Sequence, residues 1–566
     1  MKKIAKRFWS KYKIYFLLGP AAKLFEAVFE LLTPLIMADM IDNGLSGGRG
    51  YILRGGLIII AFGVFGLLFT MCCQYMGSKV AANVQNDIED ALFLHINKFE
   101  YAEIDRFGAP TLINRLNNDI TQVSMATALT IRLVVRAPFL VAGATVMAVS
   151  IDPKLGSIFA VLIPLIVGTL WFVTAKTAPR FRFVQNLLDR IAAVTSEQIA
   201  GVRVIRAFGK EDFEKERFLK ANTEYKTAIT KTSAAAALSN PLTYALLNLG
   251  IAVILWAGAF RVNTGHLTQG ELLAFINYAV QMSVAVSAVA MLVITFTKAM
   301  ASAERINEIL DTDVSVSETD NPIAKLVSEN ETVLELSGVS FRFDGTSENA
   351  LDDINFKLKK GEMLGITGIT GSGKTALINL LPRFYEAEGV IKLFGCDIKT
   401  LKKSVLREKI AVVPQKSALF SGTILDNLRF GNPNLTEEAA KNALEIACIG
   451  NIDIGAPVES GGGNFSGGQR QRLAIARAVA ASPAILILDD SFSALDRKTE
   501  AAIRESLRKK LPETAVICVS QRINSIRDAD EIILLDDGKI TARGVHENLV
   551  KTSAEYADIC NSQDIE

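Results

Sequence analysis

Eight consecutive residues constrain the fold of this chain more than any other feature. They read Gly368-Ile369-Thr370-Gly371-Ser372-Gly373-Lys374-Thr375 and fit the phosphate-binding pattern G-x-x-x-x-G-K-[ST]. The apolar residues 363–367 before them predict a buried strand, and residues 375–381 after them predict a helix. A strand, a glycine-rich loop and a helix in this order are typical of a phosphate-binding site. The sequence therefore predicts a nucleotide site here, rather than a glycine-rich surface turn.

The residues of this loop have separate expected roles. Their N–H groups would surround a phosphate chain at a helix N-terminus, which favours anions. Lys374 would reach the β- and γ-phosphates of ATP, and the Thr375 hydroxyl would bind Mg²⁺. The expected ATP-binding loop consists of Gly368, Ile369, Thr370, Gly371, Ser372, Gly373, Lys374, Thr375 and Ala376.

Two carboxylates follow another expected strand. The continuous apolar run 484–488 is typical of a strand buried on both faces, and it ends in Asp489 and Asp490. Asp489 can hold Mg²⁺ through water. Gln415 ends a further β-like run. The expected Mg²⁺ ligands are Thr375, Gln415 and Asp489.

An aromatic residue is a candidate contact for the base. Phe343 ends the alternating run 339–343, which predicts a strand ahead of the phosphate-binding loop. Its ring would either stack on a purine or pack as an ordinary core residue of that strand.

Charge and metal-binding residues exclude some classes of function. The 61 Lys and Arg residues nearly balance the 60 Asp and Glu residues, so a general nucleic-acid role has no electrostatic support. The six cysteines form neither a metal-ligand spacing nor a disulfide framework. With three histidines in all, the chain offers little for a histidine-based metal site.

The first half of the chain is predicted to cross a membrane. Half of all residues are hydrophobic, and long apolar runs with few charges concentrate there. Six runs approach the roughly 20 residues that a spanning helix needs. They lie near residues 14–38, 55–76, 131–150, 155–175, 241–260 and 272–297. Lys23, Glu26 and Glu30 interrupt the first run, and they would face either a water-filled cavity or an ion-pair partner on another helix.

The connections between these runs alternate in length. Residues 151–154 form a tight turn, whereas residues 77–130 and 176–240 are long, polar and helical in pattern. Lys and Arg gather in the long segments, which places these segments and both termini in the cytoplasm. Each long segment has a turn, near 107–110 and 201–203, that would either contact the second half of the chain or merely connect helices.

Together these motifs resemble those of ATP-binding-cassette (ABC) exporter half-transporters, over nearly the whole chain. Ser466, Gly467, Gly468 and Gln469 match the family signature, and residues 493–496, ending in Asp496, match its D-loop. Gln415 matches the Q-loop glutamine, Phe343 the base-stacking aromatic, and residues 197–208 resemble the second intracellular segment. The resemblance implies that two nucleotide-binding domains close head to tail, with each ATP between one phosphate loop and the other domain's signature. Closure would turn the membrane halves from inward-facing to outward-facing.

The resemblance also implies an architecture and a set of partners. We expect an α-helical six-span membrane domain of the type I ABC exporter kind, followed by an α/β P-loop nucleotide-binding domain. The expected divisions are 1–310 for the membrane domain, 311–331 for a polar linker and 332–566 for the nucleotide-binding domain. The expected ligands are ATP and Mg²⁺, and the expected location is the inner cell membrane with the nucleotide-binding domain in the cytoplasm. The partners would be a second, non-identical half-transporter, the lipid bilayer and a hydrophobic small molecule, with no nucleic acid.

Two positions depart from the family pattern. Asp490 stands where the family has a glutamate that orients the attacking water, and its carboxylate is withdrawn by about 1.5 Å. Gln521 stands where the family has a histidine beside the γ-phosphate, and an amide cannot become cationic. Residues 458–462 also resemble the version found in degenerate halves of heterodimeric multidrug exporters. We therefore predict that this chain binds ATP but hydrolyses it poorly, while its signature completes a competent site on a different half.

The transported compound is less constrained. Hydrophobic or amphipathic compounds are the leading expectation, and lipid or peptide export is the alternative. A nucleotide-gated regulator or channel is a third hypothesis, from a different functional class. Candidate cavity residues, each of which could equally pack against a neighbour, are Phe25, Phe29, Phe139, Trp171, Tyr244 and Phe296.

Overall fold

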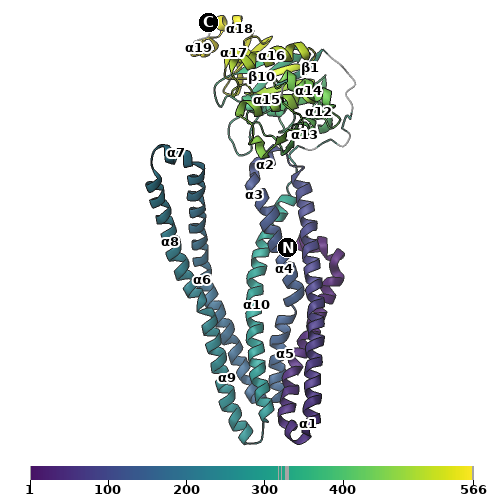
Figure 1. Cartoon of the computed structure of the whole chain (residues 1–566), viewed down its shortest axis with the longest axis vertical. Coiled ribbons are helices and arrows are strands. Elements are labelled where there is room, and N and C mark those ends of the chain that lie inside the picture. The colour runs from purple at the N-terminus through teal and green to yellow at the C-terminus, as the bar shows by residue number, and fades with distance from the viewer. Residues whose placement is uncertain (1, 317, 320–321, 325–330, 451, 564–566) are drawn as a thin grey trace. The chain divides into compact units, whose positions relative to one another are not determined.

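The computed structural model describes residues 2–316, 318–319, 322–324, 331–450 and 452–563 (Figure 1). Parts of the expected linker, residues 317, 320–321 and 325–330, lie outside the described residues. The chain divides into two compact units. The helical unit comprises Met1–Asn97 and Pro110–Thr312, and the α/β unit comprises Lys98–Ala109 and Asp313–Glu566.

The helical unit is built from long helices. α1 is interrupted at Gly48, whose φ of 71° is not helical, so its two parts form a hairpin. Asp152 caps the N-terminus of α6, because its side chain accepts hydrogen bonds from the N–H groups of Lys154 and Leu155. In chain order the elements are α1 (Lys2–Ile96), α3 (Ala109–Asn114), the π-helical turn η1 (Arg115–Asp119), α4 (Ile120–Leu133), α5 (Arg136–Ile151), α6 (Pro153–Ala200), α7 (Val202–Ala207), α8 (Glu211–Ala237), α9 (Ser239–Asn263) and α10 (Gln269–Leu310).

Five helices in the described part of the chain are long and apolar enough to cross a membrane. They are Ser46–Ile96, Ala109–Ile151, Pro153–Ala200, Glu211–Asn263 and Gln269–Leu310, and they contain the last five of the expected spans. The first expected span, residues 14–38, is helical but is not among them, because three charged residues lie within it. Membrane-spanning helices are thus found, while a total of six stays a prediction.

The charges in the first expected span pair with one another and with α5. Lys23 pairs with Glu26 and donates a hydrogen bond to Thr70 Oγ1 at 3.3 Å. Arg136 Nη2 lies 2.7 Å from Glu30 Oε2, and Arg136 Nε lies 3.7 Å from Glu26 Oε1. These charged residues were expected to face either a water-filled cavity or an ion-pair partner on another helix. The structure shows ion pairs between helices, made with Arg136 of α5.

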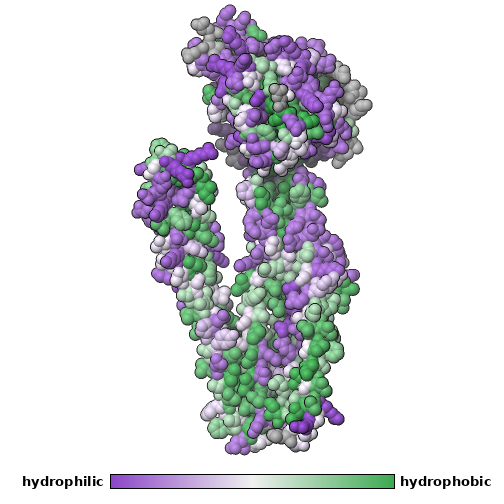
Figure 2. Space-filling model, viewed as in Figure 1, coloured by the Kyte–Doolittle hydropathy of each residue, from purple (hydrophilic) through white to green (hydrophobic). Residues whose placement is uncertain are grey.

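Apolar side chains lie both inside the helical unit and on its outer face. The inner core includes Phe159, Phe275 and Tyr278, whose hydroxyl donates to the Leu31 carbonyl at 2.8 Å. In Figure 2, hydrophobic residues gather over the lower part of this unit, and hydrophilic residues are frequent around α7. An apolar outer face suits contact with the hydrocarbon of a bilayer. Helices also suit that environment, because they satisfy their own backbone polar groups.

The α/β unit contains a six-stranded sheet whose order is β12-β11-β3-β10-β9-β6. The inner pairs are parallel, and β12 pairs antiparallel with β11 at one edge. Because the parallel strands are covered on both faces, they are almost wholly apolar. Their bounds are β3 (Met363–Thr367), β6 (Ile410–Val413), β9 (Ile485–Asp489), β10 (Ala515–Val519), β11 (Glu531–Asp536) and β12 (Lys539–Gly544).

Smaller sheets and helices complete this unit. A second, antiparallel sheet has the order β2-β1-β4-β5, and β7 pairs with β8. These strands are β1 (Thr332–Phe341), β2 (Leu351–Lys359), β4 (Glu388–Leu393), β5 (Cys396–Asp397), β7 (Gly422–Thr423) and β8 (Pro457–Val458). The helices are α2 (Tyr101–Phe107), α11 (Lys374–Leu380), α12 (Lys403–Lys409), α13 (Ile424–Arg429), α14 (Glu437–Ile446), the 3₁₀ turn η2 (Ser460–Gly462), α15 (Gly467–Ala480), α16 (Arg497–Lys510), α17 (Ile523–Ile526), α18 (His546–Thr552) and α19 (Ala554–Asn561).

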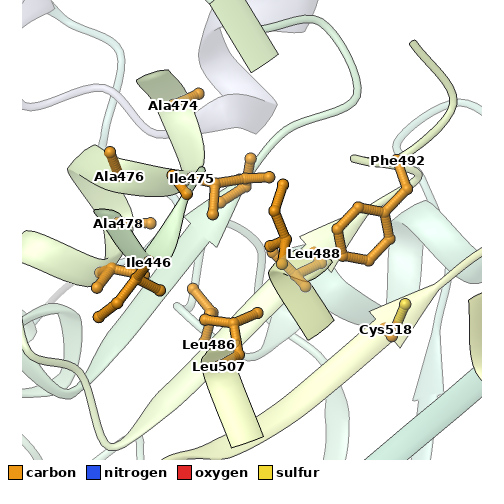
Figure 3. Close-up of a cluster of buried hydrophobic side chains, with 14 of the residues drawn as sticks. Ile446, Ala474, Ile475, Ala476, Ala478, Leu486, Leu488, Phe492, Leu507 and Cys518 are labelled. Carbon is orange, nitrogen blue, oxygen red and sulfur yellow. The ribbon is translucent and has the colours of Figure 1, made fainter. Parts of the chain in front are cut away.

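A continuous apolar core lies against one face of the six-stranded sheet. Figure 3 shows Ile475 of α15 and Ile446 of α14 near Leu486 and Leu488 of β9. Phe492, which follows β9, is also buried in this cluster. The core therefore fixes the position at which β9 ends and its two carboxylates begin.

The short helix α2 docks on the α/β unit. Its preceding residue Glu100 is buried, and its carboxylate lies 2.8 Å from Lys403 Nζ and 2.7 Å from Arg407 Nη2. The ring of Tyr101 stacks on Phe384 with centroids 4.3 Å apart. α2 ends at Phe107, the first residue of the expected turn at 107–110. These contacts come from residues before that turn, so a contact made by the turn itself stays a prediction.

Candidate functional site

One cavity of about 360 Å³ brings together most of the predicted nucleotide-binding residues. It lies at the carboxyl ends of β3 and β9, which neighbour β10 on either side. This is the edge of a parallel sheet where ligands usually bind. The lining residues are Phe343, Ala350, Thr370, Gly371, Gly373, Lys374, Thr375, Ala376, Asn379, Gln415, Asp489, Asp490, Val519, Ser520 and Gln521.

The backbone of the phosphate-binding loop can be formed only with glycine at key positions. Gly373 has a φ of 98° and leads directly into α11. A Cβ at Gly373 would lie 2.5 Å from the carbonyl oxygen of Ala350, and one at Gly368 would lie 2.0 Å from that of Leu535. At these two positions the loop passes so close to neighbouring backbones that only glycine fits.

Lys374 closes over this loop. Its ammonium donates hydrogen bonds to the carbonyls of Gly368 at 2.8 Å and Ile369 at 2.6 Å. Burial lowers the pKa of Lys374, an effect that the charges of Asp489 and Asp490 oppose. A bound phosphate would offer the ammonium a charged acceptor in place of neutral carbonyls, which makes a stronger hydrogen bond.

The two carboxylates at the end of β9, Asp489 within the strand and Asp490 after it, occupy different surroundings. Burial and the charge of Asp490 raise the pKa of Asp489 to about 6, and Lys374 opposes the rise. Asp490 has a φ of 45°, unusual for a residue with a side chain, and its N–H donates to the Val519 carbonyl at 2.9 Å. Its carboxylate accepts a hydrogen bond from Gln415 Nε2 at 3.3 Å.

Gln521 follows β10 and faces the phosphate-binding loop. Its Nε2 donates to Thr370 Oγ1 at 3.4 Å, a long hydrogen bond. Arg522, beside it, donates to the Ser493 carbonyl at 3.1 Å. The loop after β10 therefore links the phosphate-binding loop to the turn that begins the D-loop-like residues.

The side chains present fit a magnesium ion. Thr375 offers a hydroxyl, Gln415 an amide oxygen and Asp489 a carboxylate, and all three line the same cavity. Oxygen donors that include one or two carboxylates are what Mg²⁺ takes from proteins when phosphates and water supply the rest. In the residues that the structure describes, no group of three or more His, Cys, Asp and Glu side chains could hold a metal ion.

The residues that resemble the family signature lie outside this cavity. Ser466 caps α15, because its Oγ accepts from the Gln469 N–H at 3.3 Å while Gln469 Oε1 accepts from the Ser466 N–H at 2.9 Å. Gly467 and Gly468 form the first turn of the helix. Asp496 caps the next helix, α16, through the Thr499 N–H at 2.9 Å.

Phe343 was expected to end a strand, but the observed strand β1 stops two residues before it. β1 ends at Phe341, because the chain turns there and the Phe341 carbonyl accepts from the Ala350 N–H at 2.8 Å. The Phe343 ring packs edge-on against Phe341 and Tyr385 and is 37% exposed. It therefore has packing neighbours and is also partly exposed, and it lines the cavity.

Four lining residues were not predicted from the sequence: Ala350, Asn379, Val519 and Ser520. Asn379 lies one turn after Thr375 on α11, so helical spacing could have indicated it. Ser520 could have been inferred as the neighbour of Gln521. Ala350 carries no chemical signal, because it reaches the cavity only through the hairpin that joins β1 to β2.

Comparisons with known proteins agree with this architecture. Residues 16–286 match the family described as ABC transporter transmembrane region, and residues 351–493 match the family described as ABC transporter. An uncharacterized ABC transporter ATP-binding protein of Mycobacterium tuberculosis is 35% identical over 553 residues, covering 96% of this chain and 95% of that protein. An ATP-dependent lipid A-core flippase of Hahella chejuensis is 30% identical over 527 residues, covering 90% of this chain and 88% of that protein. The structure of a bacterial Atm1-family ABC exporter with ATP bound is similar over 100% of both chains, with a TM-score of 0.78 and 23% identity.

Proposed function

The chain belongs to the ABC exporters as a half-transporter, and from this premise we propose that it forms one half of a heterodimeric exporter of hydrophobic or amphipathic compounds. Its own nucleotide site would bind ATP with Mg²⁺ and turn it over slowly. Its signature residues would complete a competent site on a second, non-identical half. The assembly would lie in the inner cell membrane with the nucleotide-binding domain in the cytoplasm, where ATP is present.

The observation that carries this proposal is the geometry of Asp490. Its carboxylate accepts a hydrogen bond from Gln415, and it hangs on a side chain one methylene shorter than glutamate. A misplacement of about 1 Å can slow a reaction on the order of 100-fold, and loss of a general base costs roughly 10²–10⁴-fold. Gln521 would lower the rate of hydrolysis further, because a neutral amide stabilises developing negative charge less than a cationic imidazole does.

The binding residues, by contrast, are all present. Lys374, Thr375 and Asp489 line one cavity, and bound Mg²⁺ would neutralise part of the phosphate charge there. Lys374 would hold the β- and γ-phosphates, and Phe343 would offer its free face to the base. Tight binding with slow turnover is the behaviour that this combination supports.

The signature supports the second part of the proposal. Ser466 and Gln469 form a reciprocal cap, so the start of α15 is well ordered. A Cβ added at Gly467 would meet none of the described atoms within 4 Å. As N–H groups at a helix start, those of Gly467 and Gly468 would suit the γ-phosphate on a partner subunit.

Purification under mild detergent tests the pairing. We expect a second ABC half-transporter to co-purify, with glutamate and histidine at the positions equivalent to Asp490 and Gln521. Restoring both residues here, by Asp490→Glu with Gln521→His, should raise ATP hydrolysis by the purified complex. A complex whose rate is unchanged by this double substitution would contradict a slow site caused by these two residues.

Lipid export is a second candidate, favoured by the similarity to the lipid A-core flippase. Lipids and hydrophobic drugs share the amphipathic chemistry that such a membrane domain would accept. Reconstitution into liposomes would separate lipid export from export of hydrophobic compounds. ATP-dependent translocation of a labelled lipid, together with no stimulation of ATP hydrolysis by hydrophobic dyes, would favour lipid export.

A further inference from the structure

A glutamine beyond the last helix holds the loop that carries Gln521. Gln563 Oε1 accepts a hydrogen bond from the Ile523 N–H at 3.0 Å. Its Nε2 donates to the Gln521 carbonyl at 2.8 Å. One side-chain amide therefore bonds both backbone groups that flank Arg522. One contact needs an acceptor and the other a donor, so together they fix the orientation of the amide.

The backbone that carries Gln563 is itself held by the core. Tyr556 and Cys560 of α19 are 0% and 2% exposed and belong to the same apolar cluster as β9. The Tyr556 hydroxyl lies 2.9 Å from His546 Nδ1 of α18. The Gln563 N–H donates to the Cys560 carbonyl at 3.0 Å, which continues the helix by a tight turn. The amide of Gln563 thus extends from a fixed point.

The other side of the same loop faces the nucleotide cavity. Gln521 lines that cavity and reaches Thr370 of the phosphate-binding loop. A backbone bonded at Gln521 and Ile523 fixes the direction in which the Gln521 side chain leaves the chain. Contacts therefore run from the core through α19 and Gln563 to Gln521.

We propose that Gln563 is a positioning residue that keeps the Gln521 amide at the γ-phosphate end of the site. This inference rests on the proposed binding of ATP by this chain. Its consequence is a preference for ATP over ADP, because only ATP carries the phosphate that a correctly held Gln521 would contact. A residue that merely anchors the C-terminal helix would affect folding, and with it both nucleotides alike.

Competition photolabelling of the full transporter can separate these roles. A photoreactive azido-ATP labels each subunit at its own site, and the band of this chain is read after electrophoresis. Unlabelled ATP or ADP then competes for the label. The variants are Gln563→Ala, which removes both hydrogen bonds, and Gln563→Glu, which keeps the acceptor but loses the donor. The control is Asn561→Ala, which removes an exposed amide two residues away.

Both Gln563 variants should need roughly two- to tenfold more ATP to compete, the range for one neutral hydrogen bond, with ADP competition unchanged. In a Gln521→Ala background, Gln563→Ala should have no further effect. Equal losses for ATP and ADP, or ATP competition equal to that of the unaltered chain, would overturn the proposal. Absence of label on the unaltered chain would overturn the proposed ATP binding and this inference with it.

Discussion

The phosphate-binding half and the hydrolytic half of the nucleotide site differ in how completely they are built. The proposed binding half, from Gly368 to Thr375 with Asp489, has each of the residues expected to hold nucleotide and metal, on a backbone whose close approaches require glycine. The hydrolytic half has Asp490 and Gln521 in place of the glutamate and histidine that the family resemblance predicts. Residues of both halves line one cavity, so under the proposed function binding and turnover would rest on separable side chains.

The contacts reinforce this difference. The Lys374 side chain makes two hydrogen bonds of 2.8 Å or less inside the binding half. Within the described residues, the side chains of Asp490 and Gln521 make one hydrogen bond each, at 3.3 and 3.4 Å. Short contacts to a fixed loop indicate a preformed binding surface. The following predictions test how far the two halves are independent.

Lys374→Ala should have the largest effect. Removing a charged donor from the phosphates should weaken ATP binding by this chain roughly 10- to 100-fold, from the usual range for hydrogen bonds to charged groups. Photolabelling of this subunit in the full complex measures it. Lys360→Ala is the matched control, since that lysine pairs with Glu513 at the surface, with 3.2 Å between charged atoms. Binding that survives Lys374→Ala unchanged would break the comparison, because the binding half would not depend on its central cation.

Gly373→Ala should have the next largest effect. With a φ of 98° and a neighbouring carbonyl 2.5 Å from the new Cβ, the substitution should cost about 1–3 kcal/mol and distort the loop. We expect a lower thermal unfolding midpoint of the full-length chain in detergent, together with weaker ATP labelling. The control is Gly467→Ala on α15, where a Cβ meets no described atom within 4 Å and no loss of stability is expected.

Asp489→Asn should have the smallest effect, and that effect should depend on pH. The folded chain raises the pKa of Asp489 to about 6 from the ordinary 3.8, so it favours the neutral carboxyl. The stability that this group contributes is fully present below pH 3.8 and is lost as pH rises through 6. Without nucleotide, Asp489→Asn should therefore leave the unfolding midpoint unchanged near pH 4 and raise it above pH 6. An equal shift at both pH values would contradict the burial and charge repulsion inferred for this carboxyl.

Local sequence patterns were enough to predict the glycine-rich loop, the strand before it and the two carboxylates at the end of β9. Each of these lies in one continuous segment, so its apolar residues and the glycine or charged residues that end the apolar run can be seen directly in the sequence. The order of a helical membrane unit and an α/β unit, and the resemblance to ABC half-transporters, are confirmed by the family matches. The roles of the individual site residues stay predictions.

Features that join distant segments could not be predicted in the same way. Glu100 lies in a polar stretch of the first half, yet its ion-pair partners Lys403 and Arg407 are some 300 positions away along the chain. Ala350 and Gln563 reach the site or its loop only through the packing of a hairpin and of α19. Pairing of this kind depends on tertiary structure, and neither residue type signals it.

Steady-state ATP hydrolysis by purified assemblies that contain only copies of this chain tests the central claim most directly. The same preparation is labelled with azido-ATP to show that nucleotide is bound. We predict clear labelling with hydrolysis roughly 100-fold or more below that of the complex with the second half-transporter. Hydrolysis at the full rate of that complex would contradict the claim that this chain holds ATP at a slow site.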